Sequence, residues 1–269
     1  MRIPFIKMHG LGNDFVVIDA RETALPVSAA RARALADRHT GIGCDQFIVL
    51  EPSVQADVKM RIFNPDGSEV GACGNASRAV GLLLGGHTRI ETAGGLIEAR
   101  ASQAGIAVDM GAPRFDWDAV PLAYAMDTLA MPLAWESLEN PVAVNVGNPH
   151  AVFFVPDAQG VDLARLGPII EHDAVFPERV NVNVASLVGP DHLALRVWER
   201  GAGLTRACGT GACATAVAAM RRKLVGRSVA VDLPGGTLQI EWPEGGTITM
   251  TGPATTSFEG VFDDALYPL

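Results

Sequence analysis

Two cysteines share the same local surroundings, and their chemistry is that of a pair of acid–base groups. Cys73 and Cys208 each stand between an alanine and a glycine, after a strand-like run and a glycine-containing turn. An alanine-rich stretch follows each one, which predicts that both cysteines lie at the N-terminus of a helix. Unpaired backbone N–H groups and the helix dipole favour negative charge there, so a thiol ionises more easily and a carboxylate is held more easily.

Two such sulfurs on opposite sides of one carbon atom would invert a stereocentre. One thiolate removes a proton from the carbon, and the other thiol delivers a proton to the opposite face. The pair needs one thiolate and one thiol at a time, so the two groups titrate as a coupled unit. This chemistry requires neither a cofactor nor a metal ion. We therefore predict that Cys73 and Cys208 are catalytic, and we interpret Cys44 and Cys213 as small buried residues.

An internal repeat relates the two cysteines. Residues 58–75 and 193–210 align without a gap at an offset of 135, and the same offset relates Asn13 to Asn148 and Gln46 to Asn181. Polar residues thus recur in register across half of the chain. A tandem duplication of one α+β unit is the simplest explanation. The duplication predicts two similar domains whose cysteines face each other across the cleft between them, where we expect the active site.

The elements that must position these residues are mostly short strands. Beta-like runs bounded by turn residues occur at 15–19, 47–50, 58–63, 96–101, 106–110, 151–155, 193–198, 228–232 and 247–251. Helices are expected at 29–38 behind a Ser28 cap, from Asp162 to about Glu171 with Pro168 disturbing the interior, and after Cys73 and Cys208. This mixture is typical of an α+β fold.

The expected domain boundary follows from the repeat. We predict an N-terminal domain at 1–112, with the segment at about 254–269 packing back on it, and a C-terminal domain at 113–253. The segment 111–141 contains four prolines and keeps no clear apolar period, so we interpret it as the connection between the halves.

Composition limits the class of protein. Of the 269 residues, 48% are hydrophobic and 19% are charged, which is typical of a folded chain. The formal charge of −9 argues against nucleic-acid and membrane-surface partners but leaves room for an anionic small molecule. No apolar run approaches the roughly 20 residues of a membrane span. We see no secretory signal, and four cysteines do not make a disulfide scaffold, so we expect a cytoplasmic protein.

Several motifs spread along the chain resemble those of diaminopimelate epimerase. They are Lys7–Phe15, Gly41–Gln46, Phe63–Glu69 leading to Cys73–Asn75, Gly147–His150, Asn181–Asn183, and Val197–Gly201 leading to Cys208–Gly211. The resemblance covers nearly the whole chain, and the set is far more specific than a lone Cys-Gly pair. The chain departs from the commoner pattern at Ala72, where methionine is usual, and at Ala76-Ser77, where Gly-Ala is usual.

The resemblance implies a fold and an activity. It implies two similar domains, each a mostly antiparallel sheet curled around a central helix, and an enzyme that is usually a homodimer. The activity would be cofactor-independent epimerisation of LL-2,6-diaminopimelate to meso-diaminopimelate (EC 5.1.1.7), in lysine and peptidoglycan precursor biosynthesis. The partner would be this small-molecule substrate.

The resemblance also implies roles for individual residues. Cys73 and Cys208 would be the acid–base pair, while His150 and Glu199 would modulate their pKa values. The substrate-binding residues would be Asn13, Gln46, Asn64, Gly74, Asn75, Asn148, Asn181, Glu199, Arg200, Gly209 and Thr210. Diaminopimelate carries two carboxylates and two ammonium groups, and amide and guanidinium side chains supply the donors and acceptors that such a molecule needs.

Other interpretations remain open at this stage. The nearest is a proline or hydroxyproline racemase-type isomerase of the same fold, which also uses paired cysteines. A structural zinc site would need two closely spaced cysteine pairs, and a thiol oxidoreductase would need a C-x-x-C motif; the sequence has neither. The sequence contains no phosphate-binding glycine motif, so nothing in it indicates nucleotide use.

Overall fold

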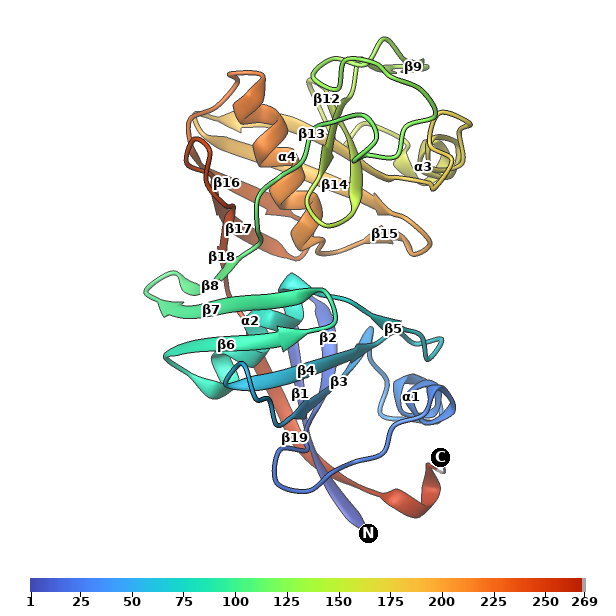
Figure 1. Cartoon of the computed structure of the whole chain (residues 1–269). Helices are drawn as coiled ribbons and strands as arrows, with labels where there is room; N and C mark the ends of the chain where they lie inside the picture. The colour runs from blue at the N-terminus through green and yellow to red at the C-terminus, as the bar shows by residue number, and fades with distance from the viewer. Residues whose placement is uncertain (268–269) are drawn as a thin grey trace. The chain divides into compact units, whose positions relative to one another are not determined.

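The structure is a computed structural model that describes residues 1–267 (Figure 1). The chain forms two compact units. The first comprises Met1–Val108 together with the segment from Gly252 onward, and the second comprises Asp109–Thr251. The first unit combines an N-terminal and a C-terminal segment because strand β19 (Thr255–Asp263) pairs antiparallel with strand β1 (Arg2–Gly10).

The first unit is a mostly antiparallel sheet with two helices. After β1 its strands are β2 (Asn13–Asp19), β3 (Gln46–Glu51), β4 (Val58–Phe63), β5 (Glu69–Val70), β6 (His87–Thr92), β7 (Gly95–Ser102) and β8 (Gly105–Asp109). The helices are α1 (Ala29–Ala36) and α2 (Gly74–Leu84), and a short 3₁₀ helix η1 (Asp264–Leu266) follows β19. Only β2–β3 and β4–β6 pair in parallel among the described strands of this unit.

The second unit has a matching set of elements. Its strands are β9 (Ala134–Trp135), β10 (Leu138–Glu139), β11 (Val142–Asn145), β12 (Pro149–Phe154), β13 (Asn181–Gly189), β14 (His192–Glu199), β15 (Gly203–Thr205), β16 (Ser228–Leu233), β17 (Gly236–Glu241) and β18 (Thr249–Gly252). Its helices are α3 (Leu163–Glu171) and α4 (Gly209–Arg221).

The pairing order is the same in both units. Strands β1 to β7 pair in sequence as antiparallel, parallel, antiparallel, antiparallel, parallel and antiparallel partners, with β4 serving both β5 and β6. Strands β11 to β17 repeat this order. The register repeats as well, since Phe15 pairs with Gln46 and His150 with Asn181 at the offset of 135. The α+β duplication predicted from the sequence is therefore confirmed.

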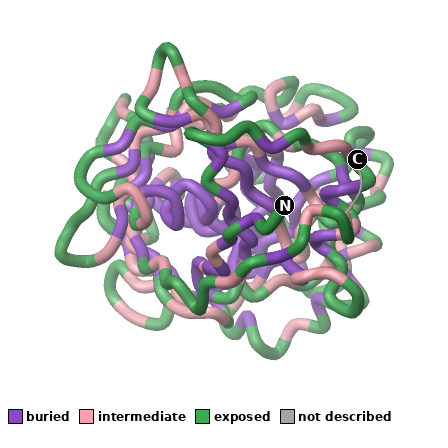
Figure 2. The backbone as a smooth tube through the Cα atoms, turned by 90° about the horizontal axis from the view of Figure 1, so that it is seen from below, coloured by how far each residue is buried: buried purple, intermediate pink, exposed green. Residues whose placement is uncertain are grey.

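Each sheet curls around one buried helix. Helix α2 packs against β1, β6 and β7, and helix α4 packs against β11 to β14, β16 and β17. A helix that is surrounded on all sides needs small or apolar residues around its whole circumference. The alanine-rich sequence of α4 meets this requirement, since every residue from Gly211 to Met220 is buried. In α2 the residues from Gly74 to Gly81 are buried, and they include the charged Arg78. In Figure 2 the buried stretches are mainly strands and these helices, and the exposed stretches are mainly loops.

The peripheral helices differ in their caps. Ser28 caps α1 as predicted, and its hydroxyl accepts from the backbone N–H of Arg31 at 3.1 Å. Asp162 occupies the cap position of α3, but its side chain makes no capping hydrogen bond. Helix α3 continues through Pro168 to Glu171, contrary to the expected disturbance.

Several strands were not predicted from the sequence. The nine predicted runs all lie in or overlap observed strands, but β1, β13 and β19 are each nine residues long and were missed. The segment 111–141 lies within the second unit. Its residues Val120, Leu122 and Met131 are buried and pack in the core of the second unit.

Among the helices of residues 1–267, none is long and apolar enough to cross a membrane.

The second unit also holds a small hairpin outside its main sheet, formed by β9 and β10. Trp135 of this hairpin stacks on Phe176 and packs edge-on against Phe153, which ties the hairpin to the core.

The packing of α2 predicts the effect of filling Gly81. A Cβ atom there would lie 2.7 Å from the Cβ of Ala99 and 3.0 Å from the Cγ2 of Ile106. We expect Gly81→Ala to lower the free energy of unfolding by about 1 kcal/mol, because overpacking of about 1–3 kcal/mol exceeds the helix-propensity gain of about 1 kcal/mol. Urea unfolding measures this, with Leu82→Ala at an exposed position of the same helix as the control. Equal or higher stability of Gly81→Ala would contradict the packing described.

Candidate active site

Cys73 is the N-cap residue of α2. Its Sγ accepts from the backbone N–H of Ala76 at 3.4 Å, so the sulfur takes the place that a serine or aspartate oxygen usually holds. The backbone around Cys73 is extended, with φ −150° and ψ 111°. This geometry places the thiol beside the first backbone N–H groups of the helix, including those of Gly74 and Asn75. These groups have no acceptor within the helix itself.

Asn13 lies next to this thiol. It follows Gly12, whose φ of 91° lets β1 and β2 join in a tight turn. Its Oδ1 lies 4.0 Å from Cys73 Sγ and accepts from Asn75 Nδ2 at 3.0 Å. Its Nδ2 donates to Asp45 Oδ2 at 3.2 Å. Because a carboxylate only accepts hydrogen bonds, Asp45 fixes the amide of Asn13 with its oxygen toward Cys73.

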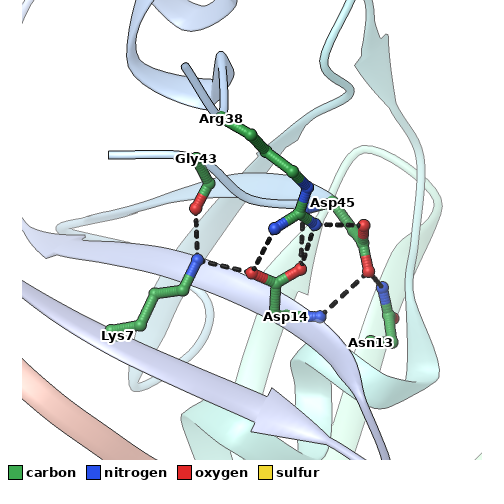
Figure 3. A network of polar contacts seen from close by, with 6 residues as sticks. All are labelled: Lys7, Asn13, Asp14, Arg38, Gly43 and Asp45. Carbon is green, nitrogen blue, oxygen red and sulfur yellow. Dashed lines mark hydrogen bonds and ion pairs between the residues drawn. The ribbon is translucent and has the colours of Figure 1, made fainter. Parts of the chain in front are cut away.

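A network of charges holds Asp45 in place (Figure 3). Arg38 donates to Asp45 Oδ1 at 2.7 Å and to Asp14 Oδ1 at 2.6 Å. Lys7 donates to the other oxygen of Asp14 at 2.5 Å and to the carbonyl of Gly43. Burial alone would raise the pKa of Asp14, but hydrogen bonds from Arg38 and Lys7 outweigh it and lower that pKa to about 2. The Asp14 carboxylate therefore stays charged at neutral pH.

The other predicted residues of the first unit lie at different distances from this group. Gln46 begins β3 beside Phe15 of β2, and its buried Oε1 has no hydrogen-bond partner among the described residues. Asn64 lies after β4 in a turn, where its Nδ2 donates to the Ser68 hydroxyl at 3.2 Å. Asn64 makes no hydrogen bond to Cys73, Asn13 or Asn75 in the described part of the chain.

Cys208 repeats the arrangement of Cys73 in the second unit. It is the N-cap residue of α4, and its Sγ accepts from the Gly211 N–H at 3.3 Å. The Thr210 hydroxyl lies 3.5 Å from the same sulfur. A Cβ at position 211 would come within 3.1 Å of this Sγ, so the glycine makes room for the thiol. Burial and the nearby Glu199 carboxylate raise the pKa of Cys208 well above its ordinary value.

The end of β14 and the turn after it carry Glu199 and Arg200, and two side chains hold this segment in place. Asn181 accepts from the backbone N–H of Arg200 at 2.9 Å and donates to the carbonyl of Pro149 at 2.8 Å. The buried carboxylate of Glu171 accepts from Trp198 Nε1 at 2.7 Å and from the Gly201 N–H at 3.0 Å. Glu199 itself accepts from the Thr205 hydroxyl. The position of both predicted residues is thus determined by α3 and β13.

His150 is completely buried and lies between two amides. Its Nδ1 is 3.1 Å from Asn183 Oδ1, and its Nε2 is 3.0 Å from Asn148 Oδ1. Burial lowers the pKa of His150 to about 4; the hydrogen bond with Asn183 opposes this shift, and the positive charge of Arg200 adds a smaller lowering effect. His150 is therefore a neutral imidazole at pH 7.

Each unit brings together part of the predicted set. The first gathers Cys73, Gly74, Asn75 and Asn13. The second gathers Cys208, Gly209, Thr210 and Glu199 around one helix end, and connects His150 to Asn148 and Asn181 to Arg200. Three contributors were not predicted: Asp45, Asn183 and Glu171. Asn183 stands two residues after Asn181, so the strand alternation would have placed both side chains on one face.

No group of three or more His, Cys, Asp or Glu side chains within residues 1–267 is placed to share a metal ion. Among the predicted site residues, those at the two helix N-termini and Arg200 are able to hold an anionic ligand.

Comparison with known proteins relates both units to one family. The family model described as diaminopimelate epimerase matches residues 5–115 and 142–257. The chain belongs to the diaminopimelate epimerase family. A diaminopimelate epimerase of Erythrobacter litoralis is 67% identical over 264 residues, covering 98% of each chain. One of Zymomonas mobilis is 59% identical over 268 residues, covering 99% of this chain and all of the relative.

Solved structures share the fold at much lower identity. A PhzF-family phenazine biosynthesis protein of Enterococcus faecalis has a TM-score of 0.71 at 15% identity, covering 98% of this chain and all of that one. A hydroxyproline epimerase of Agrobacterium vitis has a TM-score of 0.66 at 18% identity, covering 99% and 94%. These likenesses show that the chain shares the fold of those proteins.

The buried His150 predicts a loss of stability in acid. Its pKa is 6.5 in a model peptide and about 4 in the fold, so between these values the unfolded chain binds a proton that the folded chain does not. Above pH 6.5 the burial of neutral His150 costs no free energy of unfolding. Below pH 6.5 the free energy of unfolding falls by about 1.4 kcal/mol per pH unit, to a total loss of roughly 3 kcal/mol near pH 4.

Urea unfolding at pH 7.5 and pH 5 measures this effect. The wild type should lose more stability between the two pH values than His150→Gln does. His39→Gln, at an exposed position, is the control and should keep the wild-type pH dependence. The same pH dependence in wild type and His150→Gln would refute the neutral buried imidazole.

Proposed function

We propose that this chain is an isomerase that converts LL-2,6-diaminopimelate to meso-diaminopimelate, in lysine and peptidoglycan precursor biosynthesis. One observation carries the proposal. Two duplicated units each place a cysteine as the N-cap of a buried central helix, within a chain that matches the diaminopimelate epimerase family over both units.

In the proposed mechanism the two sulfurs act on opposite faces of the same carbon. A thiolate takes the α-proton, the electron pair of the C–H bond stays on the carbon, and the other S–H donates its proton from the far side. The raised pKa of Cys208 supports its assignment as the protonated partner before the substrate binds. In the direction that starts from this state, Cys73 is the base and Cys208 is the acid. In the reverse direction the two roles exchange. No cofactor takes part.

The two helix N-termini hold the reacting α-carboxylate. Negative charge spreads from the carbanion onto this carboxylate, and the backbone N–H groups of Gly74, Asn75, Gly209 and Thr210 stabilise it there. The burial of α2 and α4 supports this role, because charge–dipole interactions are stronger where water is excluded.

The remaining predicted residues bind the polar groups of the substrate. The Gln46 Oε1 is an acceptor suited to a substrate ammonium, and the exposed Arg200 guanidinium is suited to the distal carboxylate. Asn13, Asn64, Asn148 and Glu199 complete the set. Asn181 already bonds at both ends of its amide, so its contact with the substrate requires exchange of one of these bonds. His150 and Glu199 modulate the two thiols.

The decisive experiment incubates LL-diaminopimelate with protein that has been dialysed against a chelator, without pyridoxal phosphate. We expect meso-diaminopimelate to form, and we expect Cys73→Ala and Cys208→Ala each to abolish conversion in both directions. The loss should reach at least the roughly 10²–10⁴-fold effect of a general acid or base. A single-thiol variant keeps one proton-transfer group, so slow deuterium uptake with retention of configuration is the expected residual reaction.

Cys44→Ala is the matched control, because Cys44 is a buried cysteine outside the helix ends. It should retain conversion within a few-fold of wild type. Near wild-type conversion by Cys208→Ala would refute the two-thiol mechanism. Activity that returns only with pyridoxal phosphate would refute cofactor independence. Inversion of proline or hydroxyproline instead of diaminopimelate would favour the other isomerase of this fold.

We further propose that the enzyme works as a cytoplasmic homodimer, which the family resemblance supports. Sedimentation equilibrium should give twice the mass of one chain at micromolar concentration. A single-chain mass at that concentration, together with full activity, would refute the dimer as the working form.

A further inference from the structure

The last residue of helix α3 is a buried carboxylate that bonds to two sides of one turn. Glu171 is only 2% exposed. Its Oε2 accepts from the indole Nε1–H of Trp198 at 2.7 Å, and its Oε1 accepts from the backbone N–H of Gly201 at 3.0 Å. These two donors stand directly before and directly after Glu199 and Arg200 in the sequence. One carboxylate therefore holds both sides of the segment that carries two of the predicted site residues.

The same face of α3 also receives the indole ring. Gly167 stands four residues before Glu171, so the two positions lie on one side of the helix. A Cβ at position 167 would come within 2.5 Å of Cγ and Cδ2 of Trp198, so glycine lets the ring lie this close to the helix. The ring also lies beside Gly203 of β15, where an added Cβ would be 3.5 Å away. Trp198 is thus fixed by packing as well as by its hydrogen bond.

The backbone between these contacts forms a tight turn, in which the carbonyl of Glu199 accepts from the Ala202 N–H at 3.0 Å. The N–H of Arg200 is bound by Asn181 of β13, and Glu171 of α3 binds the N–H of the residue that follows. Both bonds come from elements outside the turn. The position of the turn, and with it that of the Glu199 and Arg200 side chains, therefore depends on α3 and β13.

Both oxygens of the carboxylate are needed to meet these donors. A glutamine has one oxygen and one NH₂ group, so it would accept from one donor and turn a second donor toward the other. Burying a carboxylate costs free energy that an apolar side chain would not cost, and hydrogen bonds at both oxygens offset this cost. The guanidinium of Arg179 adds a favourable charge 3.9 Å from Oε1. The chemistry of Glu171 thus matches the turn rather than the packing of α3.

We propose that Glu171 is a positioning residue of the reaction, which holds the turn after β14 so that Glu199 and Arg200 stay in place for the thiol and the substrate. It acts through the turn and not by contact with the reacting atoms. The roles of Glu199 and Arg200 rest on the proposed function, whereas the restraint on the turn does not.

Hydrogen–deuterium exchange of the peptide that spans 199–203 tests this restraint without activity. The indole bond is the shorter of the two, so in Glu171→Gln the glutamine oxygen should stay with Trp198 and leave the Gly201 N–H without an acceptor. Exchange of this peptide should become about tenfold faster, the effect of one lost hydrogen bond, while helix α4 keeps its exchange rate. Unchanged exchange at 199–203 overturns the proposal, and equal acceleration in α4 counts against it as general unfolding.

Glu136→Gln is the matched control. It makes the same substitution at an exposed carboxylate that bonds Arg165 of α3 and not the turn. It should leave exchange at 199–203 unchanged. A tenfold effect of this variant as well would show that any weakening of α3 loosens the turn, and would refute a specific role of Glu171.

A second background tests whether one carboxylate serves both donors. Trp198→Phe removes the indole donor, so in this background the glutamine oxygen of Glu171→Gln is free to accept from the Gly201 N–H. The substitution should then change exchange at 199–203 by less than about threefold. A tenfold effect in both backgrounds would refute the shared carboxylate.

Kinetics separate this inference from the proposed function. If the wild type epimerises diaminopimelate, Glu171→Gln should raise KM about tenfold through the displaced Arg200 and should also lower kcat through Glu199. Loss of folded protein alone would lower the apparent kcat and leave KM unchanged, and that result would refute the role in the reaction. Wild-type protein that shows the restrained turn but no epimerisation would refute the proposed function and leave the restraint standing.

Discussion

The first turn of a buried helix must find acceptors for its backbone N–H groups, and this requirement governs the chemistry of both units. In each unit a cysteine sulfur meets part of it, at Ala76 and at Gly211. A sulfur held by a helix end has a defined position, and it lies beside further N–H groups that favour negative charge. The curled sheets exist around these helices, so the same packing that buries α2 and α4 also places the two thiols.

The sequence was most informative where one physical rule acted alone. Ser28, the two cysteines and the alanine-rich stretches predicted helix starts, because capping and burial on all sides leave few residue choices. The duplication was also visible, because polar residues at 13 and 46 recur at 148 and 181. The strands β1 and β19 were harder to predict. Most of β19 is exposed, with Phe262 its one buried residue, and β1 contains Pro4 and Gly10, which usually interrupt strands.

The candidate site was only partly visible in the sequence. Residues that touch a thiol were assigned a role from the sequence, whereas Asp45 and Asn183, although they lie inside recognised motifs, were not. Asp45, Glu171 and Asn183 form hydrogen bonds with Asn13, Gly201 and Thr215, which lie 30 to 32 positions away, and nothing in local spacing reports such pairs. The low pKa of His150 likewise depends on complete burial, which a single histidine in a strand does not reveal. These hydrogen bonds and this pKa shift depend on tertiary packing.

The pairing of β19 with β1 has a consequence for synthesis of the chain. The second unit is one continuous segment, so it has all of its strands as soon as residue 251 leaves the ribosome. The first unit is synthesised first, but its strand β19 is synthesised last. The edge of β1 that pairs with β19 stays unpaired until then. An unpaired strand edge is a template for wrong partners. A chain that ends before β19 therefore leaves the first unit with the edge of β1 unpaired.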